Sequence, residues 1–137
     1  MISLRTSLYF DGRCQAAFEL YERCLGGKIA FLLKWGDSPM AADAPPAWRD
    51  KILYARLMIG ATELLGADLP PGGYRPPQGF GVMLELDDPA EAERVFKALA
   101  ADGVVRMPLK ETFWAALYGG LTDQFGVPWE INCGRPH

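Results

Sequence analysis

The alternation of apolar and polar positions along the chain repeats one pattern twice. An apolar run ends at Asp11, an amphipathic segment follows, and Gly27 precedes a second apolar run. The same succession recurs from Asp87 to Gly103, over an interval of equal length. A repeated strand–helix–strand unit predicts two similar modules that pack together. Because ligands commonly bind between such modules, the repeat bears on function as well as on fold.

Periodicity predicts a strand–helix–strand–strand–strand order in each half of the chain. Apolar residues recur three and four positions apart in segments 14–25 and 89–102, which predicts two helices. Asp88 is a natural N-cap for the second helix, and Pro89 suits its first position. We expect strands at residues 3–10, 28–35, 51–59 and 62–67 in the first half, and at 79–87, 104–110, 113–121 and 127–133 in the second.

This order of elements predicts an α+β fold with largely antiparallel sheets, each covered by a helix on one face. We interpret the 137 residues as one domain of two modules, residues 1–67 and 79–137. A segment rich in proline and glycine, residues 68–78, is the predicted linker. Gly26 and Gly27 end a helix instead of beginning one, so they cannot form a phosphate-binding turn, and a Rossmann-type fold is disfavoured.

Composition and charge narrow the class of partners. Half of the residues are apolar and 12% are aromatic, which is ample for a packed core. The net charge of −3 is spread along the chain without a basic patch, so we expect no nucleic-acid binding. No apolar stretch is long enough to cross a membrane, and residues 1–5 lack the apolar segment of a signal peptide. We therefore expect a cytoplasmic protein that does not bind membranes.

Three cysteines and one histidine limit the possible chemistry. An odd number of cysteines without CxxC spacing argues against a disulfide framework or a zinc site, so we expect reduced, mostly buried thiols. Cys14 lies near a predicted helix N-terminus, where a thiol pKa can fall, which makes it a candidate reactive thiol. The single histidine is His137. A Ser-His-Asp triad, a Cys-His pair and a multi-histidine metal centre are therefore not expected.

Several segments resemble the vicinal oxygen chelate superfamily, which includes glyoxalase I, bleomycin-resistance proteins and extradiol dioxygenases. The most specific segment is 121–132, with the sequence LTDQFGVPWEIN, and segments 8–21, 46–52 and 108–115 also match. The chain most resembles the PhnB-like branch, often called demethylubiquinone methyltransferase-like. The resemblance implies two βαβββ modules whose curved sheets form a cup-shaped cavity, and it implies a homodimer.

The resemblance also implies where metal ligands would lie. In metal-dependent relatives the ligands sit on the first and last strands of each module. Here the positions near 4–6, 64–66 and 80–81 hold no ligand type, and only Glu130 on the last strand does. One carboxylate without companions holds a divalent ion poorly. We therefore expect no metal and no cofactor, with a divalent metal on an incomplete ligand set as the alternative. No motif supports S-adenosylmethionine binding.

Glu130 is the candidate catalytic residue. It alternates with Trp129 and Ile131, so it points into the cavity if those two face the helix. A carboxylate in an apolar cup can serve as an acid or base, whereas a carboxylate paired with an arginine is structural. Large rings in a cavity stack on planar ligands, and for Trp129 we favour the core. The predicted ligand-binding set is Tyr9, Trp35, Glu85, Trp114, Tyr118, Glu130 and Asn132.

Three functional hypotheses remain open on this basis. The first is a metal-free protein that binds a small molecule in an apolar, aromatic-lined cavity without turning it over. The second is a metal-dependent lyase, isomerase or dioxygenase of the same superfamily. The third is a subunit whose main role is assembly. Whether the protein is an enzyme stays open, and its metal content separates the first hypothesis from the second.

Overall fold

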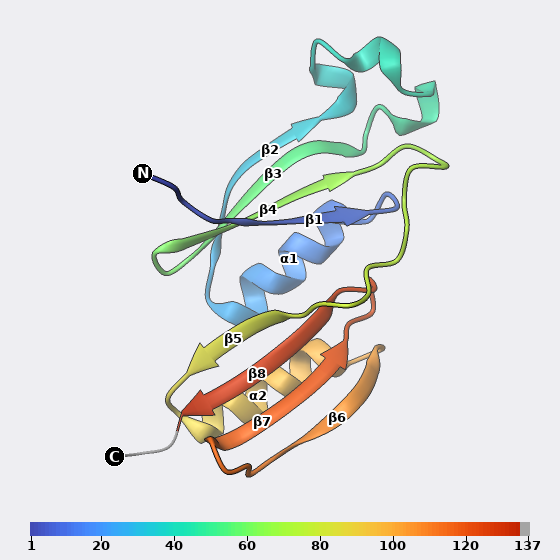
Figure 1. Ribbon diagram of the computed structural model, residues 1–137. Helices are drawn as coiled ribbons and strands as arrows, with labels where there is room; N and C mark the ends of the chain where they lie inside the picture. The colour runs from blue at the N-terminus through green and yellow to red at the C-terminus, as the bar shows by residue number, and fades with distance from the viewer. Residues whose placement is uncertain (135–137) are drawn as a thin grey trace. The chain divides into compact units, whose positions relative to one another are not determined.

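Each half of the chain folds into a four-stranded sheet with one helix packed on one of its faces, as the computed structural model in Figure 1 shows. The structure describes residues 1–134, so His137 lies outside the described residues. The chain divides into unit 1, Met1–Arg75, and unit 2, Pro76–His137. The boundary between the units falls inside the proline-rich segment 68–78. The α+β prediction with two βαβββ modules is confirmed.

Unit 1 pairs its strands in the order β1-β4-β3-β2, with β1 parallel to β4 and the other pairs antiparallel. Three short 3-10 turns, η1 to η3, connect β2 to β3. Its elements are β1 (Thr6–Phe10), α1 (Cys14–Leu25), β2 (Lys28–Lys34), η1 (Trp35–Asp37), η2 (Ala41–Asp43), η3 (Pro46–Trp48), β3 (Ile52–Ile59) and β4 (Thr62–Asp68).

Unit 2 repeats this topology in the order β5-β8-β7-β6, again with one parallel pair, β5 with β8. The two sheets are therefore mixed, with antiparallel pairs in the majority. The elements of unit 2 are β5 (Val82–Leu86), α2 (Pro89–Ala100), β6 (Val104–Lys110), β7 (Ala115–Thr122) and β8 (Pro128–Gly134).

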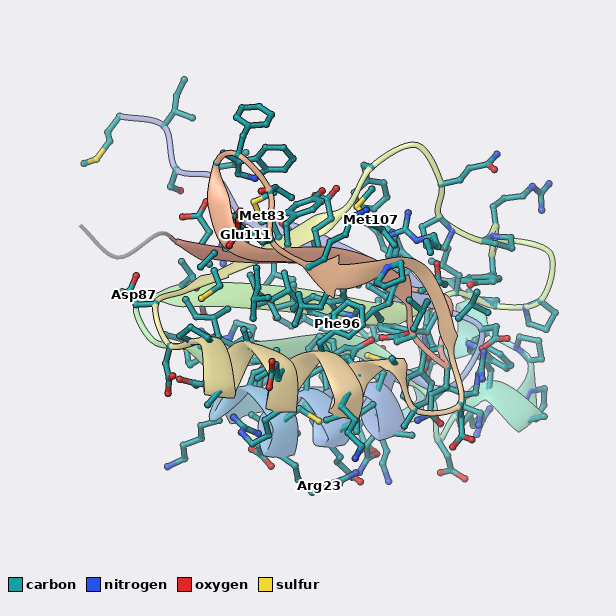
Figure 2. The ribbon with its side chains drawn as sticks, turned by 90° about the horizontal axis from the view of Figure 1, so that it is seen from below. Arg23, Met83, Asp87, Phe96, Met107 and Glu111 are labelled. Atoms are coloured by element: carbon teal, nitrogen blue, oxygen red, sulfur yellow. The ribbon has the colours of Figure 1, made fainter. Side chains whose placement is uncertain are left out.

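The core of each unit lies between its helix and its sheet. In both units a phenylalanine of the helix packs over a strand glycine. A Cβ on Gly66 of β4 would lie 2.5 Å from Phe18 Cζ, and one on Gly119 of β7 would lie 2.9 Å from Phe96 Cε2. Figure 2 shows Phe96 reaching from α2 toward the sheet. Burying such a ring stabilises the fold by roughly 1.5–3 kcal/mol, so larger residues at these glycines would separate helix and sheet.

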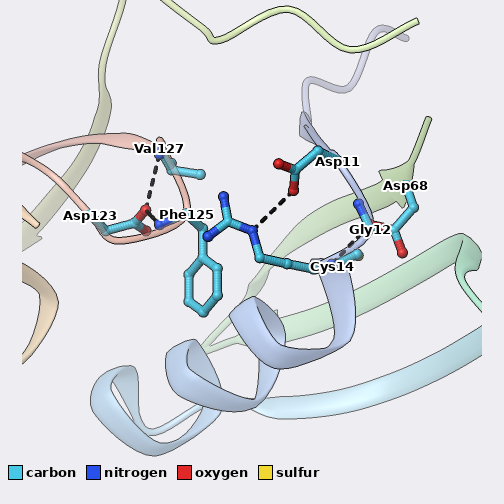
Figure 3. A network of polar contacts seen from close by, with 8 residues as sticks. Asp11, Gly12, Cys14, Asp68, Asp123, Phe125 and Val127 are labelled. Carbon is cyan, nitrogen blue, oxygen red and sulfur yellow. Dashed lines mark hydrogen bonds and ion pairs between the residues drawn. The ribbon is translucent and has the colours of Figure 1, made fainter. Parts of the chain in front are cut away.

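The two helices begin in different ways. In α2, Asp88 is the N-cap, and its carboxylate accepts a hydrogen bond from Ala90 N at 3.1 Å, which confirms the prediction. In α1, the N-cap residue Arg13 makes no side-chain cap. The acceptor for the first backbone N–H of α1 comes instead from Asp68 at the end of β4. Asp68 is the first residue of the segment that was expected to be the linker. Asp68 Oδ1 accepts from Cys14 N at 2.9 Å (Figure 3).

Among residues 1–134, the two α-helices are each 12 residues long, and neither has the length and apolar character needed to span a membrane.

Candidate functional site

The predicted site residues gather on the outer face of the unit 2 sheet, the face turned away from α2. Trp129 and Ile131 of β8 are fully buried toward α2. Because side chains alternate along a strand, Glu130 and Asn132 project from the outer face. In the parallel β5–β8 register, Met83 is opposite Glu130. Figure 2 shows Met83 and Met107 on the side of the sheet opposite α2.

Two aromatic rings and two polar side chains form a connected group on this outer face. Tyr118 Oη donates a hydrogen bond to Glu130 Oε1 at 3.0 Å, and Trp114 Nε1 donates one to Asn132 Oδ1 at 3.1 Å. The rings of Trp114 and Tyr118 meet edge to face, with centroids 5.2 Å apart. Trp114 is 48% exposed. We call these four residues the β7–β8 cluster.

The cluster perturbs the ionisation of Tyr118. Burial of the hydroxyl raises the Tyr118 pKa above its ordinary value, and both the hydrogen bond to Glu130 and the negative charge of Glu130 act in the same direction. The positive charge of Arg106 acts in the opposite direction. Tyr118 therefore stays protonated at neutral pH and holds one oxygen of the carboxylate.

Arg106 lies near the cluster without pairing with its carboxylate. Its Nη2 atom donates to the carbonyl oxygens of Leu121 at 3.0 Å and Trp129 at 3.5 Å. In the described part of the chain, no ion pair joins Glu130 to an arginine or lysine. The structural alternative for Glu130, an ion pair with an arginine, is therefore not found in this arrangement.

The second carboxylate oxygen of Glu130 has no hydrogen-bond partner among residues 1–134. It lies against Gly81, where a Cβ would be 3.1 Å from Oε2 and 3.0 Å from Cδ. The backbone at Gly81 does not have a positive φ. A side chain at position 81 would therefore press on Glu130 without straining the backbone.

The residues around Glu130 do not fit a metal ion. Position 81, where the resemblance implies a second ligand, has no side chain, and the Glu130 carboxylate fills the adjacent space. In unit 1, Leu64 is buried, and Gly66 lies under the ring of Phe18. Nowhere in residues 1–134 do three or more His, Cys, Asp or Glu side chains come together to hold a metal. A divalent cation needs several such donors, and the expectation of a metal-free protein stays a prediction.

The structure brings five of the seven predicted ligand-binding residues onto one face. Four of them form the β7–β8 cluster. The other is Glu85, which is exposed and lies opposite Asn132 in the β5–β8 register. Tyr9 is exposed on β1 of unit 1, so it belongs to the other unit. Trp35 is buried in unit 1, where its Nε1 donates to the backbone oxygen of Asp68 at 3.0 Å. Trp35 is therefore a core residue of unit 1, as Trp129 is of unit 2.

Cys14 corrects one sequence-based expectation. The cysteines at 14, 24 and 133 are free and buried, which confirms the predicted thiols. Burial raises the Cys14 pKa strongly, and the negative charge of Asp68 raises it further. A helix N-terminus can lower a thiol pKa, which made Cys14 a candidate reactive thiol. Desolvation outweighs the helix N-terminus, so the raised pKa argues against Cys14 as a reactive thiol.

Unit 1 also has a surface cavity of about 360 Å³, formed by residues 3–5 and 61–63. Arg5 and Glu63 pair across it at 3.1 Å. None of the predicted site residues lines this cavity, and it holds no exposed ring.

Sequence reasoning considered position 81 as a ligand position and Arg106 as a possible partner of Glu130, but it missed Met83 and Met107 as neighbours of the cluster. The two methionines are both exposed and add an apolar border to the polar group. The sequence alone indicates that side chains alternate between the two faces of β8 and of β5. It does not give the parallel register that places Met83 beside Glu130, which is why these neighbours were not found.

The chain is similar to known proteins in family, in sequence and in structure. The family model of the Glyoxalase/Bleomycin resistance protein/Dioxygenase superfamily matches residues 4–131. Protein YjdN of Escherichia coli is 34% identical over 133 residues, which cover 91% of this chain and 90% of that protein.

Solved structures agree with this family match. Protein PA1353 from Pseudomonas aeruginosa is 43% identical, with a TM-score of 0.90 over 99% of this chain and 100% of that one. A PhnB protein from Bacillus cereus is 20% identical, with a TM-score of 0.78 over 97% and 100% of the two chains, and it supports the fold alone. The duplicated βαβββ topology and the family match lead to one conclusion: the chain belongs to the Glyoxalase/Bleomycin resistance protein/Dioxygenase superfamily.

Proposed function

We propose that the protein binds a small planar molecule at the β7–β8 cluster without a metal ion. The ligand packs against the rings of Trp114 and Tyr118 and makes hydrogen bonds to Glu130 and Asn132. Trp and Tyr rings gain most from burial when a flat apolar surface covers them, while their polar atoms keep their partners. Met83 and Met107 extend the apolar contact beside the rings.

The observation that carries the proposal is the half-exposed Trp114 ring, whose polar atom is already paired. Trp114 is 48% exposed, its Nε1 is bound to Asn132, and its ring meets Tyr118 edge to face at 5.2 Å. A fixed ring that keeps apolar surface in solvent is a ready contact for an aromatic ligand, because little side-chain entropy is lost on binding. The donor set around Glu130 favours this metal-free reading over the metal-dependent lyase, isomerase or dioxygenase.

A fragment titration followed by NMR tests the proposal. Indole is added to ¹⁵N-labelled protein while the indole N–H signals of the tryptophans are recorded. The Trp114 signal should shift in a saturable way, and Trp114→Ala should weaken binding about tenfold or more, because the variant loses the larger ring of the contact.

Met40→Ala is the matched control. Met40 is 45% exposed, almost as much as Trp114, and lies in unit 1. This variant should bind indole as the wild-type protein does. The proposal is wrong if Trp114→Ala binds indole with unchanged affinity, or if both variants lose binding equally.

A further inference from the structure

The β7–β8 cluster fixes the direction of each of its hydrogen bonds. A tryptophan N–H can only donate, so Asn132 must turn its Oδ1 atom toward Trp114 and its NH₂ group away. A carboxylate can only accept, so the Tyr118 hydroxyl must donate to Glu130 Oε1. Neither orientation depends on which amide atom was assigned as oxygen.

Two hydrogen-bonding groups are left over after these bonds are made. Glu130 Oε2 is a free acceptor, and Asn132 Nδ2 carries two free N–H donors, since neither group has a further partner among residues 1–134. They belong to alternate residues of β8 on the same face, whose Cα atoms are about 6.6 Å apart along the strand. The outer face of β8 thus carries one free acceptor and one free donor group on alternate residues, and the residue with the free donor also holds the Trp114 ring through its Oδ1 atom.

The charges around the pair do not select for a charged ligand. Glu130, Glu85 and Glu111 are acidic, whereas Arg106 and Lys110 are basic. Figure 2 shows Glu111 on the same side of the sheet as Met83, and Lys110 is opposite Tyr118 in the β6–β7 register. The basic side chains partly offset the acidic ones at the distance of a bound ligand. Selection therefore rests on the pattern of donor and acceptor.

We propose that the site selects neutral planar ligands whose edge carries an N–H or O–H donor beside a carbonyl acceptor, as in an aromatic amide. The donor binds Glu130 Oε2, the carbonyl accepts from Asn132 Nδ2, and the ring covers Trp114. This inference rests on the proposed function, since it assigns the chemical class of ligand to the same site. A ligand with two acceptors places one of them against the Glu130 acceptor, and a ligand with two donors places one of them against the Asn132 donor.

Three probes of the same size test the inference. Benzamide carries one donor and one acceptor group, benzoate carries two acceptors, and benzamidinium carries two donors. Titration into the ¹⁵N-labelled protein is followed at the Trp114 indole and the Asn132 side-chain signals. The wild-type protein should bind benzamide about tenfold more tightly than either ion, because each ion makes one mismatched contact.

Asn132→Asp should change this preference. The aspartate still accepts from Trp114, but it presents a second acceptor in place of the donor. Benzamidinium should then bind about tenfold more tightly than benzamide, because both of its donors are matched. Lys97→Gln is the control, because it changes the net charge by the same amount on the exposed side of α2. Lys97→Gln should keep the wild-type order.

The outcomes separate the inference from the proposed function. Equal affinities of the three probes for the wild-type protein overturn the inference and leave the proposed function standing. A change of order in both Asn132→Asp and Lys97→Gln also overturns it, since net charge is then the cause. If neither these probes nor indole shifts the Trp114 or Asn132 signals, both proposals fail. The wild-type ranking alone decides the inference if Asn132→Asp does not fold.

Discussion

A single hydroxyl, that of Tyr118, joins the aromatic and acidic parts of the candidate site. It donates to Glu130 at 3.0 Å, while the ring contacts Trp114. A hydrogen bond to a charged group contributes roughly 1.5–3 kcal/mol when it is shielded from water, and less here because the pair is only partly buried. Tyr118 therefore has more effect on the orientation of Glu130 than on the stability of unit 2.

Tyr118→Phe should reduce the dependence of stability on alkaline pH. The folded protein holds the Tyr118 pKa above the ordinary value of 10.0, so folding favours the protonated hydroxyl. This contribution is fully present below about pH 10 and is lost as the pH rises through the folded pKa. Across that pH range, the free energy of unfolding, measured in urea, should fall less in the variant than in the wild-type protein. Equal losses in the two proteins would contradict this assignment of the raised pKa.

Gly81→Ala should displace the Glu130 carboxylate without straining the backbone. The new Cβ would lie 3.0 Å from Glu130 Cδ, closer than van der Waals contact allows. The side chain of Glu130 must move away, which weakens its bond to Tyr118. Benzamide affinity should fall about tenfold if the carboxylate is a ligand contact. Unchanged affinity, measured by the same NMR titration, would show that Glu130 does not bind the probe.

The three buried thiols should be unreactive in the folded protein. Burial raises the pKa of Cys14 and of Cys133, so little thiolate forms at neutral pH. A disulfide reagent such as Ellman's reagent should modify the cysteines only as fast as the protein unfolds. One thiol that reacts at the rate of a small free thiol would contradict this picture.

At the scale of elements, two buried aspartates connect segments that are distant or tightly turned. In unit 1, Asp68 accepts from the backbone N–H groups of Gly12, Cys14 and Ile52, at 3.0, 2.9 and 2.8 Å. In unit 2, Asp123 accepts from two backbone N–H groups of the β7–β8 turn and from the indole of Trp129. Figure 3 shows both carboxylates with backbone partners. Asp68 takes the place of a local cap for α1, whereas Asp123 holds the β7–β8 turn to which it belongs.

Asp68→Ala should destabilise the protein far more than Asp88→Ala. The first change leaves three backbone donors without an acceptor, and Asp68 is only 1% exposed. Each buried donor left unpaired costs roughly 1–3 kcal/mol, so a loss of about 3 kcal/mol or more is expected. Asp88 caps α2 at an exposed site, and its loss should cost about 1 kcal/mol. Urea unfolding compares the two variants, and similar losses would argue against the role of Asp68.

These aspartates mark where sequence reasoning reaches its limit. Helix α1 was predicted with the bounds it has, and Asp88 was predicted as a cap, because both signals are local. Asp68 was assigned to the linker, since its three partners lie 16 to 56 residues away in the chain. Trp35 was predicted as a ligand contact because its partner is also distant in the chain. Its hydrogen bond to Asp68 is not visible in any local pattern.

At the scale of the whole molecule, the two units share a topology but not the site. The parallel pairs β1–β4 and β5–β8 have matching registers, in which Gly66 of unit 1 corresponds to Ile131 of unit 2. The residues on either side of Gly66, Leu65 and Ala67, therefore correspond to Glu130 and Asn132. The equivalent positions of unit 1 carry neither a donor nor an acceptor. The duplication was predicted from the repeated pattern, but a repeat of elements does not show which copy keeps the polar side chains.

The homodimer implied by the family resemblance stays a proposal. Sedimentation equilibrium should give a mass twice that of the 15.1 kDa chain. The mass of a single chain, at concentrations above those used in the ligand titrations, would contradict it. The ligand-binding proposal is independent of this result, because the β7–β8 cluster belongs to one unit of one chain.

The most direct test of the account is a benzamide titration in the presence of EDTA, observed at the Trp114 indole and Asn132 side-chain signals. We expect both signals to shift together and to reach saturation with the chelator present. Signals that stay unmoved until Mn²⁺, Zn²⁺ or another divalent ion replaces the chelator would contradict the account, since the site would then depend on a metal.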